Sequence, residues 1–434
     1  MSGHDKTPTA APCRGSLPFG PPVPEAFVAA MQGRRVGLAV SGGGDSMAML
    51  HLLAGRLDLA VVTVDHGLRP EAADEARMVG QVARSLGLPH WTLRWQAPSG
   101  GNLMDLARRA RMELMGAWAR QQGVSHIAMA HTADDQMETF FMRLARASGV
   151  QGLSGMRQAW VENGVTWHRP LLDLGREDLR AYLRGIGAQW AEDPSNDNPK
   201  YDRVKVRQAA PHLAALGITP KEICQTVSHL ARAEEALSTA LAAMVARHVQ
   251  IDRGDVVVSL EGLEGEVQGE FRRRLFAVIL GWIGGGAYAP RGPKLETFCR
   301  DLAQTRTLAG VQRSQKGGSV RFTRELAAVA QQVVAVSSAQ ITQWDRWRVG
   351  RDGPEAQGET GAYACRGLTI AALGKEGLAQ CPDWRATGVP RASLLASPAV
   401  WDGPTLLAAP LAGLPNGWNA EIATPFTRSM LFTR

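Results

Sequence analysis

The stretch VGLAVSGGGDS, residues 36–46, decides the fold of this 434-residue chain. Its first five residues form an apolar run short enough for a fully buried strand, and three glycines follow within the next four positions. Residues 45–54 (DSMAMLHLLA) then have the apolar spacing of a helix. A strand that turns through glycines into a helix predicts the first unit of an α/β domain, with the turn at the carboxyl edge of the sheet.

The alternation of strand and helix continues to about residue 130. Four strands joined through helices predict parallel pairing with right-handed crossovers. We therefore expect an open, mostly parallel α/β sheet in a catalytic domain over residues 34–210, with ligands beyond the carboxyl ends of the strands. Further strands are expected at residues 59–64, 90–95 and 124–130, and helices at residues 71–86 and 103–121.

The rest of the chain lacks this alternation. A mobile leader is expected at residues 1–33, because its first part is rich in Pro, Gly and Ser. Long helical patterns at residues 221–249 and 269–282 predict a mainly helical domain over residues 211–336. Short apolar runs between Gly and Pro clusters predict a small strand-containing domain over residues 337–434.

Composition and charge exclude several classes of protein. The net charge of +7, from 48 Lys and Arg against 41 Asp and Glu, favours a phosphate-bearing partner. The five cysteines form no C-x-x-C pair, so we expect a reducing, cytoplasmic setting without a disulfide framework or a zinc site. The longest apolar stretch, residues 276–289, is broken by four glycines and is too short to span a membrane.

The loop Ser41-Gly42-Gly43-Gly44-Asp45-Ser46 is the sharpest chemical signal. Glycines let the backbone approach a phosphate closely, and the start of a helix favours an anion. Ser41 and Ser46 add hydroxyl donors, and Asp45 can hold a Mg²⁺ ion that screens the phosphates. The alternative is a structural turn with Asp45 or Ser46 as a helix cap, but the position between a buried strand and a helix favours phosphate binding.

The second signal is HTADDQMET, residues 131–139, at the same predicted edge. If a helix begins near residue 132, Asp135 and Glu138 lie one turn apart on one face, with His131 at the entry. These groups could position Mg²⁺ or the substrate. A capping box with a solvated acidic first turn is the alternative for Asp134 and Glu138.

Two further pairs of residues have a functional and a structural explanation that are equally good. Asp65 and His66 end the second strand and could line a nucleotide pocket, although a turn explains them equally well. Arg108 and Arg111 share a helix face and could reach phosphates, although a solvated helix face is an equal explanation.

Basic residues gather in two further stretches. Residues 200–207 carry four basic side chains against one acid, which suits a nucleic acid backbone, although a basic loop capping the first domain is the alternative. Residues 311–324 contain no acid. We expect a nucleic acid to lie along both stretches. The basic residues of the second stretch are Arg313, Lys316, Arg321 and Arg324.

In their order, the motifs SGGGDS, VDHGLRPEA, AHTADDQMETFFMRLARASGVQGLSGM, RPLL, WAEDPSN and YDRVKVR resemble the tRNA(Ile)-lysidine synthetase family of PP-loop ATP pyrophosphatases. The resemblance is strong over residues 36–207 and continues weakly into the second domain. It implies that ATP adenylylates the wobble cytidine of a CAU-anticodon tRNA(Ile), and that the ε-amino group of free L-lysine then replaces AMP at C2.

The resemblance also implies roles for single residues. Ser41 to Ser46 would hold ATP, with Asp45 on Mg²⁺, while His131 and Asp135 would orient lysine or assist the chemistry. The remaining implied substrate or tRNA contacts are Asp65, His66, Arg108, Arg111, Glu138, Asp193, Asn196, Arg203 and Arg207. Ala147 and Ala309 stand where the family usually has glycine, and a homodimer is a candidate assembly.

The nearest rival function is that of another PP-loop tRNA-modifying enzyme, such as a tRNA thiolase. Sulfur chemistry usually needs well-placed cysteines, and the sequence has none between Cys13 and Cys224. A tRNA-binding protein with an inactive nucleotide fold would predict a damaged loop, but Ser41, Asp45 and Ser46 are all present. The sequence therefore favours lysidine formation.

Overall fold

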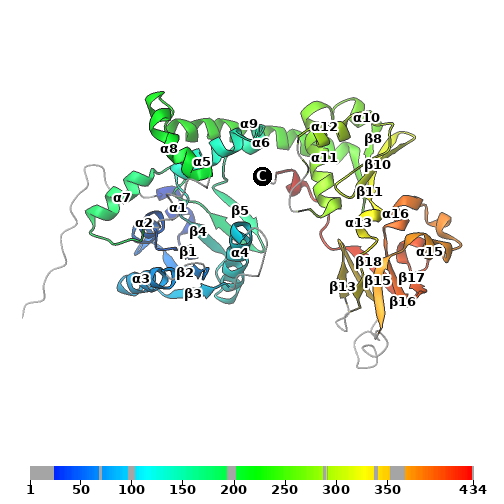
Figure 1. Ribbon diagram of the computed structural model, residues 1–434, viewed down its shortest axis with the longest axis horizontal. Coiled ribbons are helices and arrows are strands. Elements are labelled where there is room, and N and C mark those ends of the chain that lie inside the picture. Colours follow the sequence, from blue (N-terminus) through cyan, green and yellow to red (C-terminus); the bar gives the residue numbers. More distant parts are fainter. Residues whose placement is uncertain are drawn as a thin grey trace, which may run out of the picture. The chain divides into compact units, whose positions relative to one another are not determined.

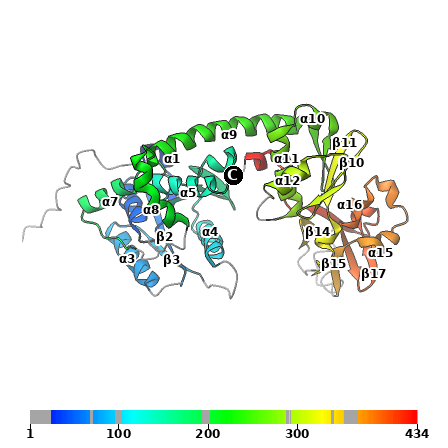
Figure 2. The same cartoon turned by 45° about the horizontal axis from the view of Figure 1, so that its top comes forward.

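A computed structural model describes residues 24–67, 71–95, 103–192, 202–286, 290, 292–336, 341–351 and 367–432. The chain forms two compact units, Met1–Glu234 and Glu235–Arg434, and the division lies inside helix α9 (Pro220–His248). Figure 2 shows α9 as one long continuous helix. The domain limits expected at residues 210 and 336 stay predictions. Among the described helices, none is both long and apolar enough to cross a membrane.

The first unit alternates strands and helices along the chain. Its strands are β1 (Arg35–Ala39), β2 (Asp58–Asp65), β3 (His90–Arg94), β4 (His126–Met129), β5 (Ala159–Glu162) and β6 (Val165–His168). Its helices before α9 are α1 (Glu25–Met31), α2 (Gly44–Leu53), α3 (Ala72–Ser85), α4 (Leu103–Gln121), α5 (Ala133–Leu144), α6 (Val150–Leu153), α7 (Arg176–Gly185) and α8 (Asp202–Ala215).

These strands form one sheet in the order β3-β2-β1-β4-β6-β5 (Figure 1). Every adjacent pair is parallel except β5 with β6, so the expected mostly parallel α/β sheet is confirmed. The chain builds outward from β1 to β3 and then returns to place β4 on the other side of β1. The turns that follow β1 and β4 therefore flank one crevice, which is where ligands bind in open α/β sheets.

The central strands of this sheet are buried on both faces. In β1, Val36 and Leu38 are fully buried against α1, α2, α3 and α7, whereas Ala39 packs with α4 on the opposite face. Gly37 lies against the indole of Trp118, because a Cβ at this position would come 3.0 Å from the ring. Helices on both faces leave the carboxyl edge of the sheet as the open edge for chemistry.

The expectation of a mobile leader up to residue 33 is wrong for its last part. Glu25–Met31 form α1, and Val28 and Met31 are buried in the same core as β1 and α2. The spacing of these two apolar residues, three apart on one helix face, gave a signal that the Pro-rich composition of the preceding segment obscured.

The second unit contains more strands than expected. The domain predicted as mainly helical over residues 211–336 also holds a five-stranded antiparallel sheet in the order β7-β8-β11-β10-β9, which was not expected there, and the domain limits stay predictions. The cause lies in β10, where the fully buried Arg313 takes an inward position and hides the alternation of a strand. The strands of this sheet are β7 (Val249–Asp252), β8 (Asp255–Ser259), β9 (Arg306–Leu308), β10 (Val311–Lys316) and β11 (Ser319–Arg324).

Two smaller antiparallel sheets follow, and the helices of this unit lie between its strands along the chain. The smaller sheets are β12 (Val334–Ala335) with β15 (Leu368–Ala372), β16 (Pro398–Asp402) and β17 (Thr405–Ala408), and β13 (Ile341–Trp344) with β14 (Trp347–Arg351) and β18 (Trp418–Ile422). The helices are α10 (Leu260–Glu264), α11 (Gly269–Gly284), α12 (Pro293–Cys299), α13 (Leu326–Val329), α15 (Gly374–Ala379) and α16 (Arg391–Leu395), with short 3₁₀ turns at Trp384–Thr387, Pro410–Ala412 and Arg428–Phe432.

Candidate active site

The loop after β1 is shaped by its own serines. The Ser46 hydroxyl donates to the Gly43 carbonyl at 2.9 Å and accepts the Ser41 amide at 3.1 Å, and the two serine hydroxyls lie 3.2 Å apart. Gly43 is the N-cap of α2, and no side chain caps this helix. The first amides of α2 therefore face the crevice without a side-chain acceptor, as an anion-binding helix start requires.

The same loop is tied to a distant segment of the first unit. Gly42 has a φ of +94°, a conformation that favours glycine, and its carbonyl accepts the Ala191 amide at 2.9 Å. Gly43 and Ala191 form an isolated parallel bridge, and a Cβ on Gly44 would lie 3.4 Å from Trp190. The start of the WAEDPSN motif thus lies directly against the glycine loop.

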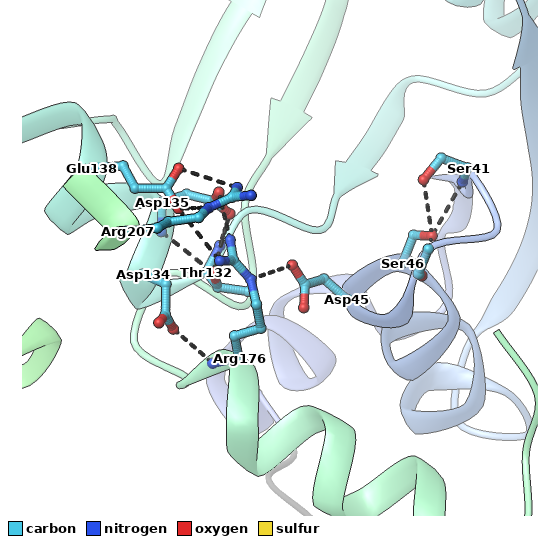
Figure 3. Close-up of polar contacts among 10 residues, drawn as sticks. Ser41, Asp45, Ser46, Thr132, Asp134, Asp135, Glu138, Arg176 and Arg207 are labelled. Atoms are coloured by element: carbon cyan, nitrogen blue, oxygen red, sulfur yellow. Dashed lines mark hydrogen bonds and ion pairs between the residues drawn. The ribbon is translucent and has the colours of Figure 1, made fainter. Parts of the chain in front are cut away.

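One arginine joins the acidic residues that follow β1 and β4. Arg176 is the first residue of α7, and its guanidinium reaches the carboxylates of Asp45 at 3.3 Å, Asp135 at 3.1 Å and Glu138 at 3.3 Å (Figure 3). Its backbone amide also donates to the Asp134 carboxylate at 2.7 Å. The structure therefore brings the predicted Asp45, Asp135 and Glu138 into one cluster around a residue that sequence reasoning missed.

The helix α5 fixes the acidic side of this cluster. Thr132 and Asp135 form a capping box, in which the Thr132 amide donates to Asp135 at 2.8 Å and the Thr132 hydroxyl accepts the Asp135 amide. Glu138, one turn along, is 3% exposed and also accepts Arg207 Nε at 2.6 Å. The capping role expected as an alternative for Asp134 and Glu138 is thus taken by Asp135, which still offers its other oxygen to Arg176.

The charges of the cluster act on one another. Burial raises the pKa of Asp45 and outweighs the lowering by Arg176, and the neighbouring Asp135 raises it further. Burial disfavours the charge on Arg176, but Asp135, Asp45 and Glu138 together raise its pKa above the usual range. The raised pKa of Asp45 shows that Arg176 does not fully compensate its negative charge, so a metal cation would stabilise this carboxylate further. Arg176 itself stays charged at every accessible pH.

In contrast to these acidic residues, a group of cations lies next to His131. Arg169 donates from Nε to His131 Nδ1 at 3.2 Å and stacks over Trp160 at 4.0 Å. Burial lowers the pKa of Arg169 to about 10, with Arg108 and Arg143 lowering it further. Burial and then Arg108 lower the pKa of Arg111. Across the described ranges, no hydrogen bond or ion pair links Arg108 or Arg111 to an acid, so this cluster of Arg108, Arg111, Arg169 and His131 suits an anionic ligand.

Burial and these cations together keep His131 neutral. Burial, followed by Arg169, lowers its pKa to about 3, and the nearby Asp135 offsets this only in part. Because Nδ1 accepts from Arg169, the proton of the neutral ring resides on Nε2. His131 is therefore equipped to donate a hydrogen bond and not to act as a general base.

The remaining predicted residues are spread more widely. Asp65 accepts the Gly67 amide at 2.9 Å, as in an ordinary Asx turn. His66 packs edge-on against Trp95 at 5.9 Å, and its pKa is lowered by burial and by Arg111, which places it near the cation cluster. Arg203 is exposed on α8. Asp193 and Asn196 lie outside the described residues.

Arg176 carried a signal that a closer look at the sequence could have used. A basic residue at the first position of a helix opposes the helix dipole, so it is expected to be held there by acids from elsewhere. Arg169 belongs to the RPLL motif, but nothing in that motif indicates that it contacts His131. Both contacts join residues far apart in the chain, 131 positions for Arg176 with Asp45.

The acid-free stretch of residues 311–324 is not a free basic surface. Arg313 is fully buried and donates to backbone carbonyls, among them those of Arg300, Asp301 and Gln304. Arg321 pairs with Asp252 and Asp255, at 2.7 and 2.8 Å, and Arg324 pairs with Asp345 at 3.0 Å. The expected path of a tRNA along these arginines is therefore corrected, since backbone carbonyls engage Arg313 and aspartates neutralise Arg321 and Arg324. Lys316, at the exposed end of β10, is the exception.

Comparison with known proteins identifies the relatives of this chain. Residues 24–213 match the family described as the PP-loop domain. The tRNA(Ile)-lysidine synthase of Ruegeria pomeroyi is 46% identical over 398 residues, which cover 90% of this chain and 91% of that protein. The tRNA(Ile)-lysidine synthase of Rhodopseudomonas palustris is 38% identical and covers 67% of this chain and 85% of its own length. Among solved structures, a U34-tRNA thiolase from Methanococcus maripaludis covers 48% of this chain and 78% of its own, with 15% identity and a TM-score of 0.41.

Proposed function

This chain belongs to the tRNA(Ile)-lysidine synthase family, and we propose that it joins the ε-amino group of free lysine to C2 of the wobble cytidine in a CAU-anticodon tRNA(Ile), with cleavage of ATP to AMP and pyrophosphate. The observation that carries the proposal is the similarity to such enzymes over 90% of the chain. The reaction needs a nucleotide loop, a site for anions and a site for a metal cation, and the loop after β1, the cations beside His131 and the acids around Arg176 suit these three roles. A tRNA substrate and scattered cysteines also favour a reducing, cytoplasmic setting.

The loop after β1 is the proposed site for the phosphates of ATP. The uncapped start of α2 offers amides and the positive end of the helix dipole, and Ser41 and Ser46 hold the loop in shape. Because Gly42 requires a positive φ and packs near Glu75 and Met78, larger residues there would distort the loop. A pyrophosphate leaving group would be stabilised by these donors.

Asp45 is the proposed protein ligand of Mg²⁺. The described residues contain no group of three or more acidic, His or Cys side chains placed to hold a metal. Mg²⁺ usually binds one or two carboxylates together with substrate phosphates and keeps several waters, so Asp45, beside the phosphate loop, suits this kind of shared site. Bound there, the ion would neutralise charge on the phosphates of ATP.

The proposed chemistry has two steps. The cytidine O2 attacks the α-phosphorus of ATP, and the bond from that phosphorus to the bridging oxygen breaks, so pyrophosphate leaves. The neutral ε-amine of lysine then attacks C2, AMP leaves with the former O2, and the amine loses a proton to solvent. The cation cluster of Arg108, Arg111 and Arg169, with the His131 Nε2 proton, would stabilise the negative charge on the transferred phosphate.

The rival function of a tRNA thiolase has little support in the described part of the first unit. Cys224 is the cysteine described there, and burial raises the pKa of its thiol to about 11. A thiol that stays protonated at neutral pH is a poor nucleophile and a poor metal ligand. The relatives named tRNA(Ile)-lysidine synthase agree with the main proposal.

The test is to supply ATP, labelled lysine and tRNA(Ile) transcripts that differ only at the wobble base. We expect lysine to enter the transcript with C and not the one with U at this position. Incorporation that ignored the wobble base would contradict the proposal. A second measurement follows pyrophosphate release by Asp45→Ala, which we expect to be abolished, and an unchanged rate would remove the loop from the reaction.

A further inference from the structure

Arg176 donates to a carboxylate oxygen of each of three acidic residues. Its Nε donates to Asp45 Oδ2, its Nη2 to Asp135 Oδ1 and its Nη1 to Glu138 Oε1. One planar guanidinium therefore bridges three carboxylates from two helices (Figure 3). The side chains of Arg176, Asp45 and Asp135 are each exposed by no more than about a quarter. A cation in this position satisfies the carboxylates that a metal ion would otherwise bind.

The charges of the cluster do not cancel. Asp45, Asp134, Asp135 and Glu138 supply four negative charges, and Arg176 and Arg207 supply two positive charges. The surplus of two negative charges equals the charge of one divalent cation. These carboxylates share one guanidinium in a partly buried site, so their like charges repel strongly. The cluster is therefore suited to gain a further cation.

The three carboxylates differ in how they would manage without Arg176. Glu138 keeps Arg207, and Asp135 keeps the Thr132 amide. Asp45 has no other hydrogen-bond or ion-pair partner in the part of the chain that the structure describes. The contact between Arg176 and Asp45 is therefore the one that a competing cation would break, while the rest of the cluster stays in place.

We propose that Arg176 is a tethered positioning cation that competes with Mg²⁺ for Asp45, so that this carboxylate takes the metal well only when ATP brings it. The phosphates of ATP add the attraction that displaces Arg176 from Asp45. The inference rests on the proposed use of Mg²⁺ and ATP by the loop after β1. It gives Arg176 a role in coupling metal binding to nucleotide binding.

The experiment measures metal binding without nucleotide, lysine or tRNA. Mn²⁺, detected by electron paramagnetic resonance, is titrated into the full chain and into Arg176→Gln. We expect the substituted protein to bind Mn²⁺ at least about tenfold more tightly, because a competing positive charge has left the cluster. Mg²⁺ should displace the bound Mn²⁺. The matched control is Arg184→Gln, also on α7, whose partner is the exposed Glu177, and it should leave the affinity unchanged.

A purely structural role for Arg176 makes a different prediction. It requires Arg176→Gln to lower the melting temperature equally with and without Mg²⁺, and to bind Mn²⁺ no more tightly than the natural chain, which would overturn the proposal. The proposal instead requires the melting temperature lost in a chelating buffer to return when Mg²⁺ is added. Asp45→Asn together with Arg176→Gln should lose the gained affinity.

If Arg176→Gln does not fold, Arg176→Lys answers the same question. A lysine keeps one charge but cannot bridge three carboxylates with a planar fork, so Mn²⁺ affinity should rise by a smaller factor. Unchanged affinity in this variant would overturn the proposal. The outcome is separate from the proposed ligase activity, because metal binding is measured without substrates and lysidine formation is scored by its own assay.

Discussion

Two groups of arginines, one in each unit, have opposite surroundings. In the first unit, Arg108 and Arg111 lie near His131, and no hydrogen bond or ion pair joins them to an acid in the described part of the chain. In the second unit, Arg313 donates to backbone carbonyls, and Arg321 forms ion pairs with aspartates of neighbouring strands. The sequence alone offers both groups as candidate phosphate contacts. The difference teaches that a nucleic acid or nucleotide site is marked by cations without partners and not by the number of cations.

The largest expected effect tests the structural half of this comparison. Arg313→Met should destabilise the second unit by about 4 kcal/mol, because it removes a buried charge and leaves several carbonyls without a donor. The measurement is urea unfolding followed by tryptophan fluorescence. Lys316→Met, on the same strand but exposed, should change stability by less than about 0.5 kcal/mol. If both variants unfolded at the same urea concentration, Arg313 would not be a structural arginine.

The functional half predicts loss of activity without loss of stability. Arg111→Met should lower kcat/KM for lysidine formation about 10²-fold, since it removes a donor for the developing phosphate charge. Its unfolding midpoint should stay the same or rise, because burying an unneutralised guanidinium is costly. Arg109→Met, at an exposed position of the same helix, is the control. A large drop in stability for Arg111→Met would place this arginine with those of the second unit.

The pH dependence of stability reports the cation cluster through His131. Its pKa is about 3 in the folded chain and near 6.5 when unfolded, so the unfolded state binds the proton first as the pH falls. This histidine should therefore cost about 2 kcal/mol of stability between pH 7 and pH 5. His131→Gln should remove that part of the slope in urea unfolding at several pH values. An identical slope in both proteins would mean that burial and the arginines do not keep His131 neutral.

The sequence predicted the parts of the fold that depend on neighbours in the chain. The expected helix at residues 103–121 coincides with α4, and the glycine loop lies between β1 and α2 as expected. The role of Arg176 was missed because it depends on α7 packing beside α2, which no local pattern encodes. The sheet of the second unit was missed for a related reason, since the buried Arg313 is satisfied only by carbonyls of a separate connection.

The smallest expected effect compares the two units where charge has no part. Ala147, after α5, and Ala309, in the two-residue turn between β9 and β10, both have a positive φ, 51° and 52°, where the resembling family usually has glycine. An L-residue pays roughly 1 kcal/mol in this conformation, and both methyl groups are exposed. Ala147→Gly and Ala309→Gly should each stabilise the chain by about 0.5 kcal/mol in urea unfolding. Ala145→Gly, where φ is −59°, should destabilise it by a similar amount, and equal signs at all three positions would refute the backbone argument.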